Sequence, residues 1–192
     1  MSETAENFGA PAPAVPPLVI RPARRGDIPA ITRIYNFSVL HTATTFQIAP
    51  ETERRRRAWL EAHTDRHPAF VGVAGGVVIG WTALSPYSTR EAWARTVEDS
   101  IYLDAAHHRR GYGERMLAHL LGEARRLGHR AVVARIVADH AASIGLHRKL
   151  GFVEVGRLTG VGFKLGRWHD VVYMERDFGA PAAPVPAPLP AA

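Results

Sequence analysis

Residues Ser100–Leu117 read SIYLDAAHHRRGYGERML and are the most informative stretch for the fold. Apolar residues at alternate positions end at Leu103, a basic turn follows, and an amphipathic helical pattern begins after Gly111. The first N–H groups of a helix have no internal partner, and the helix dipole adds positive potential. The stretch therefore indicates an anion site between a strand and a helix, although an ordinary turn with surface arginines remains the alternative.

The residues of this turn suit a phosphate ligand. Gly111 and Gly113 permit unusual φ angles and let a phosphate approach the backbone closely. Arg109 and Arg110 add formal positive charge beside them. Two glycines spaced in this way are weak evidence alone, so the rest of the chain has to support the assignment.

Working outward from the turn, short strands alternate with helices. Strands are predicted over residues 18–22, 70–74, 77–84, 97–103, 131–137, 152–158 and 171–175. Helices are predicted from Ile28, over 51–66, over 111–127 and over 141–150. The pattern predicts an α/β domain with a mixed sheet of about seven strands and about four helices.

Composition bounds the class of protein. Of the 192 residues, 18–178 are predicted to form one domain between two proline- and alanine-rich tails, 1–17 and 179–192, expected to be disordered. The absence of cysteine excludes disulfides, thiolate metal sites and a cysteine nucleophile, and it fits a cytoplasmic protein. No secretory signal is expected, and the longest apolar run, 69–84, is too short to span a membrane.

The net charge of +6 fits an anionic cofactor, a nucleic acid or a membrane surface. The densest basic run, Arg54–Arg57, follows Glu51 and Glu53 at ion-pairing helical spacing, which favours a solvated helix face over an anion patch. No aromatic residues interleave with it, so no nucleic-acid partner is expected. His63 and His67 lie one helical turn apart, but no third ligand accompanies them and no metal is expected.

Two motifs resemble those of the GCN5-related N-acetyltransferases (GNAT). Their acetyl-CoA loop, Gln/Arg-x-x-Gly-x-Gly/Ala, corresponds to His108–Gly113, with histidine in the first position. Their motif Asn-x-x-Ala-x-x-x-Tyr-x-Lys-x-Gly-Phe corresponds to His140–Phe152. The resemblance implies the GNAT fold, with a mostly antiparallel sheet, and acetyl-CoA as co-substrate. The cofactor-binding residues that it implies are Ile101, Tyr102, Leu103, His108, Arg109, Arg110, Gly111, Tyr112, Gly113, Glu114, His140 and Ser143.

Further segments resemble the phosphinothricin and methionine sulfoximine acetyltransferases. They are Ile34–Asn36, Thr96–Glu98, Leu146–His147 and Gly162–Asp170, and the resemblance covers about residues 18–178. It implies acetylation of the amine of a small amino-acid analogue, by direct transfer in a ternary complex, and a homodimer. Such a reaction would detoxify an inhibitor of glutamine synthetase.

Two residues are the catalytic candidates. Glu98 interrupts an apolar strand, where it is either a general base, the role that the resemblance assigns, or an ion-paired glutamate. His147 stands where many relatives have a tyrosine, so it is either a proton donor to the CoA sulfur or a packed histidine bonded to a backbone carbonyl. The resemblance also suggests a backbone N–H near Leu103 as the oxyanion donor, at a splay between strands.

The substrate side is predicted from apolar and cationic residues near presumed loops. Phe46 and Trp93 would form apolar walls, and Arg90 or Arg95 would bind a substrate carboxylate through two N–H groups. Each of these residues has a structural alternative as rim or core filler. The substrate-binding candidates are Phe46, Arg90, Trp93, Arg95, Thr96, Lys164 and His169, of which the last two would close the pocket or support a dimer partner.

Two other functions stay open. One is acetylation of a protein N-terminus or another small amine, and the other is a CoA-binding sensor without activity. The intact Glu98 argues against the sensor, and the Thr96–Glu98 and Gly162–Asp170 segments favour the small amino-acid analogue.

Overall fold

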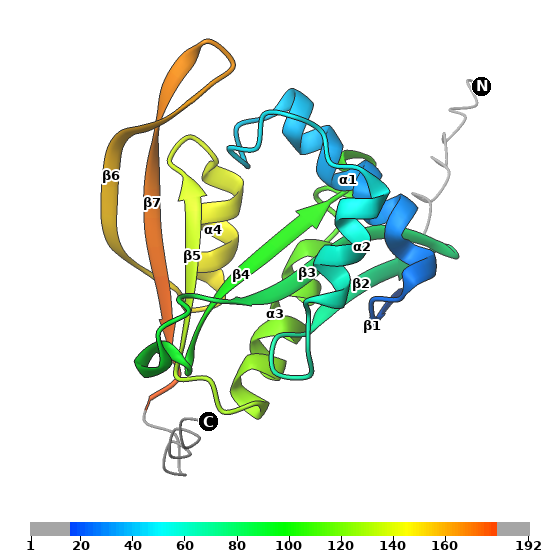
Figure 1. Ribbon diagram of the computed structural model, residues 1–192, viewed down its shortest axis with the longest axis horizontal. Coiled ribbons are helices and arrows are strands. Elements are labelled where there is room, and N and C mark those ends of the chain that lie inside the picture. Colours follow the sequence, from blue (N-terminus) through cyan, green and yellow to red (C-terminus); the bar gives the residue numbers. More distant parts are fainter. Residues whose placement is uncertain (1–15, 180–192) are drawn as a thin grey trace, which may run out of the picture.

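A computed structural model describes residues 16–179, which form a seven-stranded sheet with four α-helices against it (Figure 1). The two predicted tails therefore lie outside the described residues, apart from Pro16, Pro17 and Gly179. The elements in chain order are β1 (Leu18–Pro22), α1 (Ile28–His41), α2 (Glu53–Glu61), β2 (Ala69–Ala74), β3 (Val77–Pro86), β4 (Thr96–Leu103), α3 (Tyr112–Arg126), β5 (Ala131–Val137), α4 (Ala141–Lys149), β6 (Val153–Lys164) and β7 (Arg167–Asp177).

The sheet has the order β1-β2-β3-β4-β5-β7-β6, and every neighbouring pair except β4–β5 is antiparallel. The predicted mixed, mostly antiparallel α/β fold is confirmed. The parallel pair is short, because only Thr96–Glu98 of β4 pair with Ala131–Val133 of β5. Beyond these residues the two strands diverge, as Figure 1 shows, and open a gap in the middle of the sheet.

Hydrophobic clusters fix the helices to both faces of the sheet. On one face, Ile31 and Ile34 of α1 pack with Val71, Trp81 and Ala83 of the hairpin β2–β3. On the other face, buried leucines of α3, among them Leu117 and Leu120, pack against β3, β4, β5 and β7. Each buried isoleucine, leucine or valine contributes roughly 1.5–3 kcal/mol by its burial, so the helices stabilise the sheet on both faces.

Three predicted elements, one helix and two strands, have clearly different bounds in the structure. The helix expected over 51–66 covers only 53–61; the Thr52 hydroxyl accepts the Arg55 N–H at its start. The strands expected over 152–158 and 171–175 extend into a long hairpin that turns at Leu165 and Gly166, both with positive φ. The glycines within 158–166 weaken the alternating pattern there, and the pairing shifts register between residues 158 and 162.

The basic run on α2 also differs from its prediction at one position. Arg56 is buried with 6% of its surface exposed, and its guanidinium lies 3.5 Å from the centre of the Tyr35 ring. Burial lowers the pKa of Arg56. The interpretation as a solvated face therefore fails at Arg56, whose cation–π contacts join α2 to α1.

Neither a membrane span nor a metal cluster is found among residues 16–179. No helix there is long and apolar enough to cross a bilayer. In the same part of the chain, no three histidine, aspartate or glutamate side chains are grouped as a metal site would require.

Candidate active site

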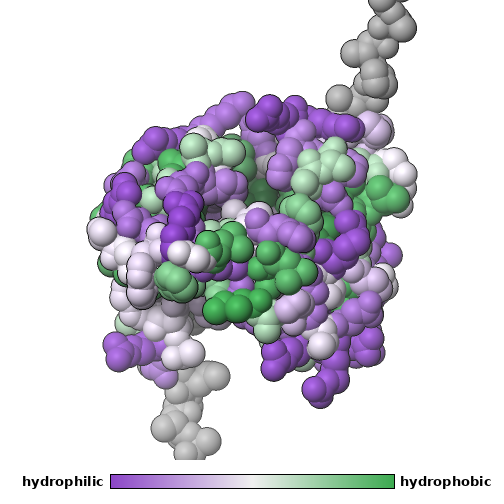
Figure 2. Space-filling model, turned by 90° about the horizontal axis from the view of Figure 1, so that it is seen from above, coloured by the Kyte–Doolittle hydropathy of each residue, from purple (hydrophilic) through white to green (hydrophobic). Residues whose placement is uncertain are grey.

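A cavity of 540 Å³ lies where β4 and β5 diverge. Its walls come from β4 and β5, from the segment after α1, from the start of α4 and from the β6–β7 hairpin. Figure 2 looks onto this end of the molecule and shows a hollow beside a group of hydrophobic residues. Of the predicted site residues, the cavity is lined by Phe46, Glu98, Ile101, Tyr102, Leu103, His108, His140, Ser143 and His147.

The alternation of β4 gives the cavity two sides. The Tyr102 ring stacks on the Trp81 ring, with centres 4.7 Å apart, on the face covered by α1 and α2. Because side chains alternate along a strand, Glu98 and Ser100 lie on the same face as Tyr102. Asp99, Ile101 and Leu103 point to the opposite face, where α3 and α4 lie. The gap between the strands connects the two sides, so that two ligands can meet there from opposite faces.

Glu98 forms a two-pronged ion pair with Arg135 of β5. Arg135 Nε donates to Oε1 at 2.8 Å, and Nη2 lies 2.7 Å from Oε2. The hydrogen bond to Glu98 raises the pKa of Arg135. The side chains are 52% and 22% exposed for Arg135 and Glu98, so this pair is open to solvent and to ligands. Glu98 thus lines the cavity, where a general base would have to lie, and it also has the ion-pair partner of the alternative interpretation.

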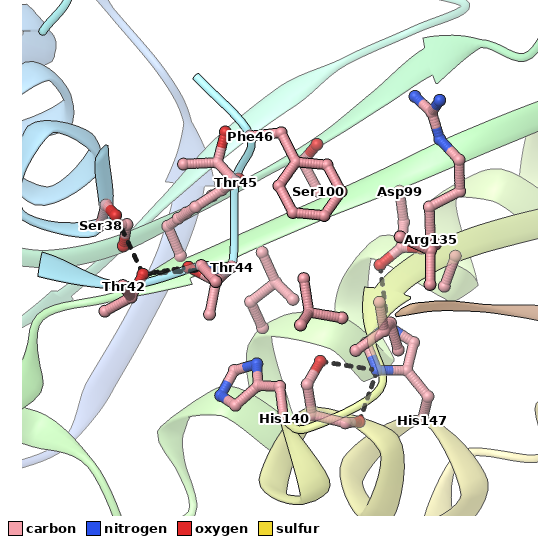
Figure 3. A pocket seen from close by; sticks show the side chains of 18 of the residues that line it. Ser38, Thr42, Thr44, Thr45, Phe46, Asp99, Ser100, Arg135, His140 and His147 are labelled. Atoms are coloured by element: carbon pink, nitrogen blue, oxygen red, sulfur yellow. Dashed lines mark hydrogen bonds and ion pairs between the residues drawn. The ribbon is translucent and has the colours of Figure 1, made fainter. Parts of the chain in front are cut away.

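His147 forms a buried network with Asp99 and Ser143 (Figure 3). Its Nδ1 donates to the Ser143 carbonyl oxygen at 2.7 Å, and its Nε2 donates to Asp99 Oδ2 at 3.1 Å. Burial alone would lower the pKa of His147, but the hydrogen bond and the charge of Asp99 outweigh it, so the pKa is raised. The bond to a backbone carbonyl matches the packed-histidine alternative, and Asp99 adds a partner that the sequence did not reveal.

The turn before α3 has the backbone that an anion requires. Arg109 and Gly111 have φ angles of 59° and 75°, and Gly111 is the N-cap of α3. The first helical hydrogen bond runs from Arg115 N to Gly111 O. The N–H groups of 112–114 therefore lack helical partners and are available to a phosphate group. This geometry fits the pyrophosphate of a coenzyme A ligand, and Arg109 and Arg110 are exposed beside it.

The side chains of the other residues predicted to bind the cofactor differ in what they contact. His108 Nε2 hydrogen-bonds the Leu103 carbonyl oxygen at 3.1 Å, which ties the turn to β4. The Tyr112 ring is buried in the core, so only its backbone faces the turn. Glu114 pairs with Lys149 at 2.6 Å and joins α3 to α4. His140, whose pKa is lowered by burial, lines the cavity.

The β6–β7 hairpin and the segment after α1 form the roof of the cavity. Lys164 Nζ donates to the Thr45 carbonyl oxygen at 2.7 Å, and burial lowers its pKa. The Phe46 ring lies against Gly162 so closely that no Cβ would fit. His169 donates from Nε2 to the Lys164 carbonyl oxygen at 3.0 Å. Lys164 and His169 thus hold the roof together from outside the cavity.

The four remaining substrate candidates are not brought together. Trp93 lines a side pocket of 350 Å³ that shares Glu98 and Arg135 with the main cavity. Arg90 is exposed and lies in neither pocket lining. Arg95 donates to the Gly128 carbonyl oxygen at 3.0 Å, near the end of β4 away from the gap. Thr96 is paired with Ala131 at the same end.

Sequence reasoning missed Asp99 and Arg135. Asp99 directly follows Glu98 in the strand over 97–103, and Arg135 places a charge inside the otherwise apolar run AVVARIV over residues 131–137. A charge in a central strand is costly unless a partner or a cavity receives it, and that cost was the available signal.

Comparison with known proteins agrees with this geometry. Residues 33–152 match the acetyltransferase (GNAT) family. The chain is 39% identical to an L-methionine sulfoximine/L-methionine sulfone acetyltransferase of Salmonella typhimurium, over 87% of this chain and 98% of that protein. A phosphinothricin acetyltransferase from Sinorhizobium meliloti, solved in complex with acetyl-CoA, is 35% identical with a TM-score of 0.82, covering 90% of this chain and 96% of that one. A ribosomal-protein-alanine N-acetyltransferase from Brucella melitensis is 36% identical with a TM-score of 0.81, covering 83% and 99%.

The chain belongs to the GNAT family. It is an N-acetyltransferase that uses acetyl-CoA.

Proposed function

We propose that this enzyme acetylates the α-amino group of a small amino-acid analogue of the methionine sulfoximine, methionine sulfone or phosphinothricin type. The observation that carries the proposal is the position of Glu98, whose carboxylate lies at the gap on the face opposite α3 and α4. The names of the relatives from Salmonella typhimurium and Sinorhizobium meliloti support this class of substrate.

Glu98 is the proposed general base. An amine attacks a thioester carbon only when its nitrogen lone pair is free, so the ammonium has to lose a proton first. Glu98 accepts that proton, directly or through a water molecule. Acetyl-CoA supplies an acyl group already activated as a thioester. With no cysteine in the chain, we propose direct transfer. The amine nitrogen bonds the carbonyl carbon, the C–S bond breaks, and CoA leaves as a thiolate that takes up the second proton lost by the nitrogen.

The backbone of β4 offers a donor for the developing oxyanion. The Asp104 N–H donates to the Ile79 carbonyl oxygen of β3. Leu103, the residue before Asp104, is paired with Gly80 of the same strand. Because N–H groups alternate in direction along a strand, the Leu103 N–H points away from β3. It therefore points toward the gap, where no β5 residue pairs with it. We propose that this N–H stabilises the thioester oxygen as it gains charge.

A second candidate function is acetylation of a protein N-terminus. The relative from Brucella melitensis, whose name specifies the alanine of a ribosomal protein, supports it. The cavity has a roof formed by Phe46 and the β6–β7 hairpin, which suits a short substrate better than an extended chain. We therefore rank the small amino-acid analogue first.

The experiment follows the release of the CoA thiol from acetyl-CoA with phosphinothricin, methionine sulfoximine, methionine sulfone, ordinary amino acids and an N-terminal peptide. We expect turnover of the first three, and a fall in kcat/KM of about 10²–10⁴-fold in Glu98→Gln, the usual contribution of a general base. Glu154→Gln is the matched control, because Glu154 pairs with Arg148 on the surface. Turnover of the peptide alone would contradict the proposed substrate. Binding of acetyl-CoA without any turnover would favour the sensor.

We further propose that the enzyme is a cytoplasmic homodimer. Strand β6 is an edge strand, and its hairpin exposes a row of large apolar side chains: Val153, Val155, Val161, Phe163, Leu165 and Trp168. An exposed apolar row on an edge strand favours association with another chain. Light scattering tests this: twice the chain mass of 21.0 kDa is expected for the wild type, and the single mass for Phe163→Glu. In the cytoplasm such an enzyme would detoxify inhibitors that resemble amino acids.

A further inference from the structure

The charges of Glu98 and Arg135 are complementary to the two ionic groups of an α-amino acid. Such a substrate carries an ammonium and a carboxylate on the same carbon atom, so the two groups lie side by side. The Glu98 carboxylate and the Arg135 guanidinium also lie side by side, with 2.7 and 2.8 Å between their nitrogen and oxygen atoms. An ammonium that approaches Glu98 therefore brings its carboxylate to Arg135.

Arg135 is in a position to receive a carboxylate. It lies where the main cavity and the side pocket meet, because both are lined by Glu98, Arg135 and Tyr173. Half of its side chain is exposed, and Figure 3 shows it extending away from the Asp99–His147 pair. A guanidinium binds a carboxylate through two parallel N–H groups, which is how Arg135 already holds Glu98. Tyr87 and Trp93, with rings 5.0 Å apart, form an apolar wall of the side pocket.

Arg135 occupies the carboxylate of the proposed base, Glu98, while no substrate is bound. Both carboxylate oxygens of Glu98 accept an N–H group of Arg135, so an incoming ammonium has to compete for them. A substrate that brings its own carboxylate offers Arg135 a replacement partner. An exposed ion pair is weakly held and exchanges readily. An amine without a carboxylate has no such replacement to offer.

On the basis of the proposed function, we propose that Arg135 binds the substrate carboxylate and that this exchange frees Glu98 to accept the ammonium proton. Arg135 is then a specificity-determining residue that favours free amino acids over simple amines. A protein N-terminus carries an amide in place of that carboxylate and would not release Glu98 in this way.

The experiment measures kcat and KM for L-methionine sulfoximine and for the same amine without its carboxylate. The enzymes are the wild type, Arg135→Ala, Arg135→Lys and Arg130→Ala. Arg130 is a matched control, since it also forms a two-pronged pair, with Asp177, but lies outside both pockets. In Arg135→Ala we expect KM for the amino acid to rise about tenfold or more, the effect of losing a charged hydrogen bond. For the amine we expect kcat/KM to rise, because Glu98 is no longer occupied.

These opposite effects distinguish substrate binding from a structural role. If Arg135 only held β4 against β5, its loss would change both substrates in the same direction, and that result would overturn the proposal. Arg135→Lys keeps the charge but not the two-pronged geometry, so we expect an intermediate KM. Unchanged kinetics in Arg135→Ala, with normal turnover by the wild type, would remove this inference alone. No wild-type turnover of any free amino acid or analogue would remove the proposed function as well.

Discussion

Two neighbouring acids on β4, Glu98 and Asp99, point to opposite faces of the sheet and have contrasting partners. Glu98 meets Arg135 in a pair that is 22% and 52% exposed, whereas Asp99 meets His147 in a pair of which only 2% of each side chain is exposed. An exposed pair contributes little to stability and exchanges its partners. Removal of one partner of a buried pair is costly, because the other partner keeps its charge with neither water nor an opposite charge beside it. Strand β4 thus carries two adjacent acids: Glu98 lies in an exposed ion pair that a ligand can reach, and Asp99 lies in a buried one.

Disruption of the buried pair of Asp99 and His147 should destabilise the protein strongly. His147→Phe leaves the Asp99 carboxylate buried without its partner, and we expect the free energy of unfolding to fall by about 3–5 kcal/mol. Denaturant unfolding of the variant and the wild type measures this. The double variant Asp99→Leu/His147→Phe removes both charges, and we expect it to recover much of the loss.

The same variants decide the role of His147 in the reaction. Since both ring nitrogens donate to fixed partners, Ser143 and Asp99, we expect the maximal rate of folded His147→Phe to stay close to that of the wild type. A kcat that falls a hundredfold or more in the folded variant, about the least that a general acid contributes, would contradict this and restore His147 as the proton donor.

The buried pair of Asp99 and His147 should also respond to pH. The pKa of His147 is raised in the folded protein, so the stability that Asp99 gives is fully present below the ordinary histidine pKa, about 6.5. It is lost as pH rises through the folded pKa, because the unfolded chain has by then released this proton. We therefore expect the difference in unfolding free energy between the wild type and Asp99→Asn to shrink as pH rises.

The test compares the unfolding free energies of two proteins, because the pH dependence that other histidines give to stability has the opposite sign. Burial lowers the pKa of His63, His67, His129 and His140, so their contributions are present above the ordinary pKa and are lost as pH falls. They cancel when two variants that share them are compared. Asp177→Asn is the control: the pKa of Asp177 is lowered by Arg130, so its effect changes only at acid pH. A difference for Asp99→Asn that stays constant from pH 6 to 9 would contradict the raised pKa.

Much of the fold could be predicted from the sequence, because the relevant signals are local. The strand, turn and helix around Gly111 are encoded within 18 residues, from Ser100 to Leu117. Strand 131–137 was predicted with its observed ends, since an apolar run bounded by glycine and polar residues has few other interpretations. The strands over 152–158 and 171–175 were expected, but their extension into the long hairpin of β6 and β7 was not. Its glycines hide the alternation, and the pairing between the strands, which defines the hairpin, leaves no local pattern.

The candidate site was less predictable, because it depends on contacts between distant segments. Glu98 and Arg135 are 37 positions apart, and Asp99 and His147 are 48 apart. The sequence pointed to Glu98 and His147 one at a time but could not pair them with their partners. The same limit applies to the carboxylate-binding candidates. Arg90 and Arg95 are predicted from their residue type, whereas Arg135 reaches the cavity from the mostly apolar strand over 131–137.

Disruption of the exposed pair of Glu98 and Arg135 should change stability least. Arg135→Ala breaks a pair that is largely open to water, so we expect the free energy of unfolding to change by less than about 1 kcal/mol. Denaturant unfolding at low and high salt measures it, and the effect should diminish at high salt because exposed charges are screened. A loss as large as that of His147→Phe, insensitive to salt, would show that both pairs are structural. A small loss together with the substrate-dependent kinetics would leave Arg135 free to exchange Glu98 for a ligand, as the contrast between the two pairs predicts.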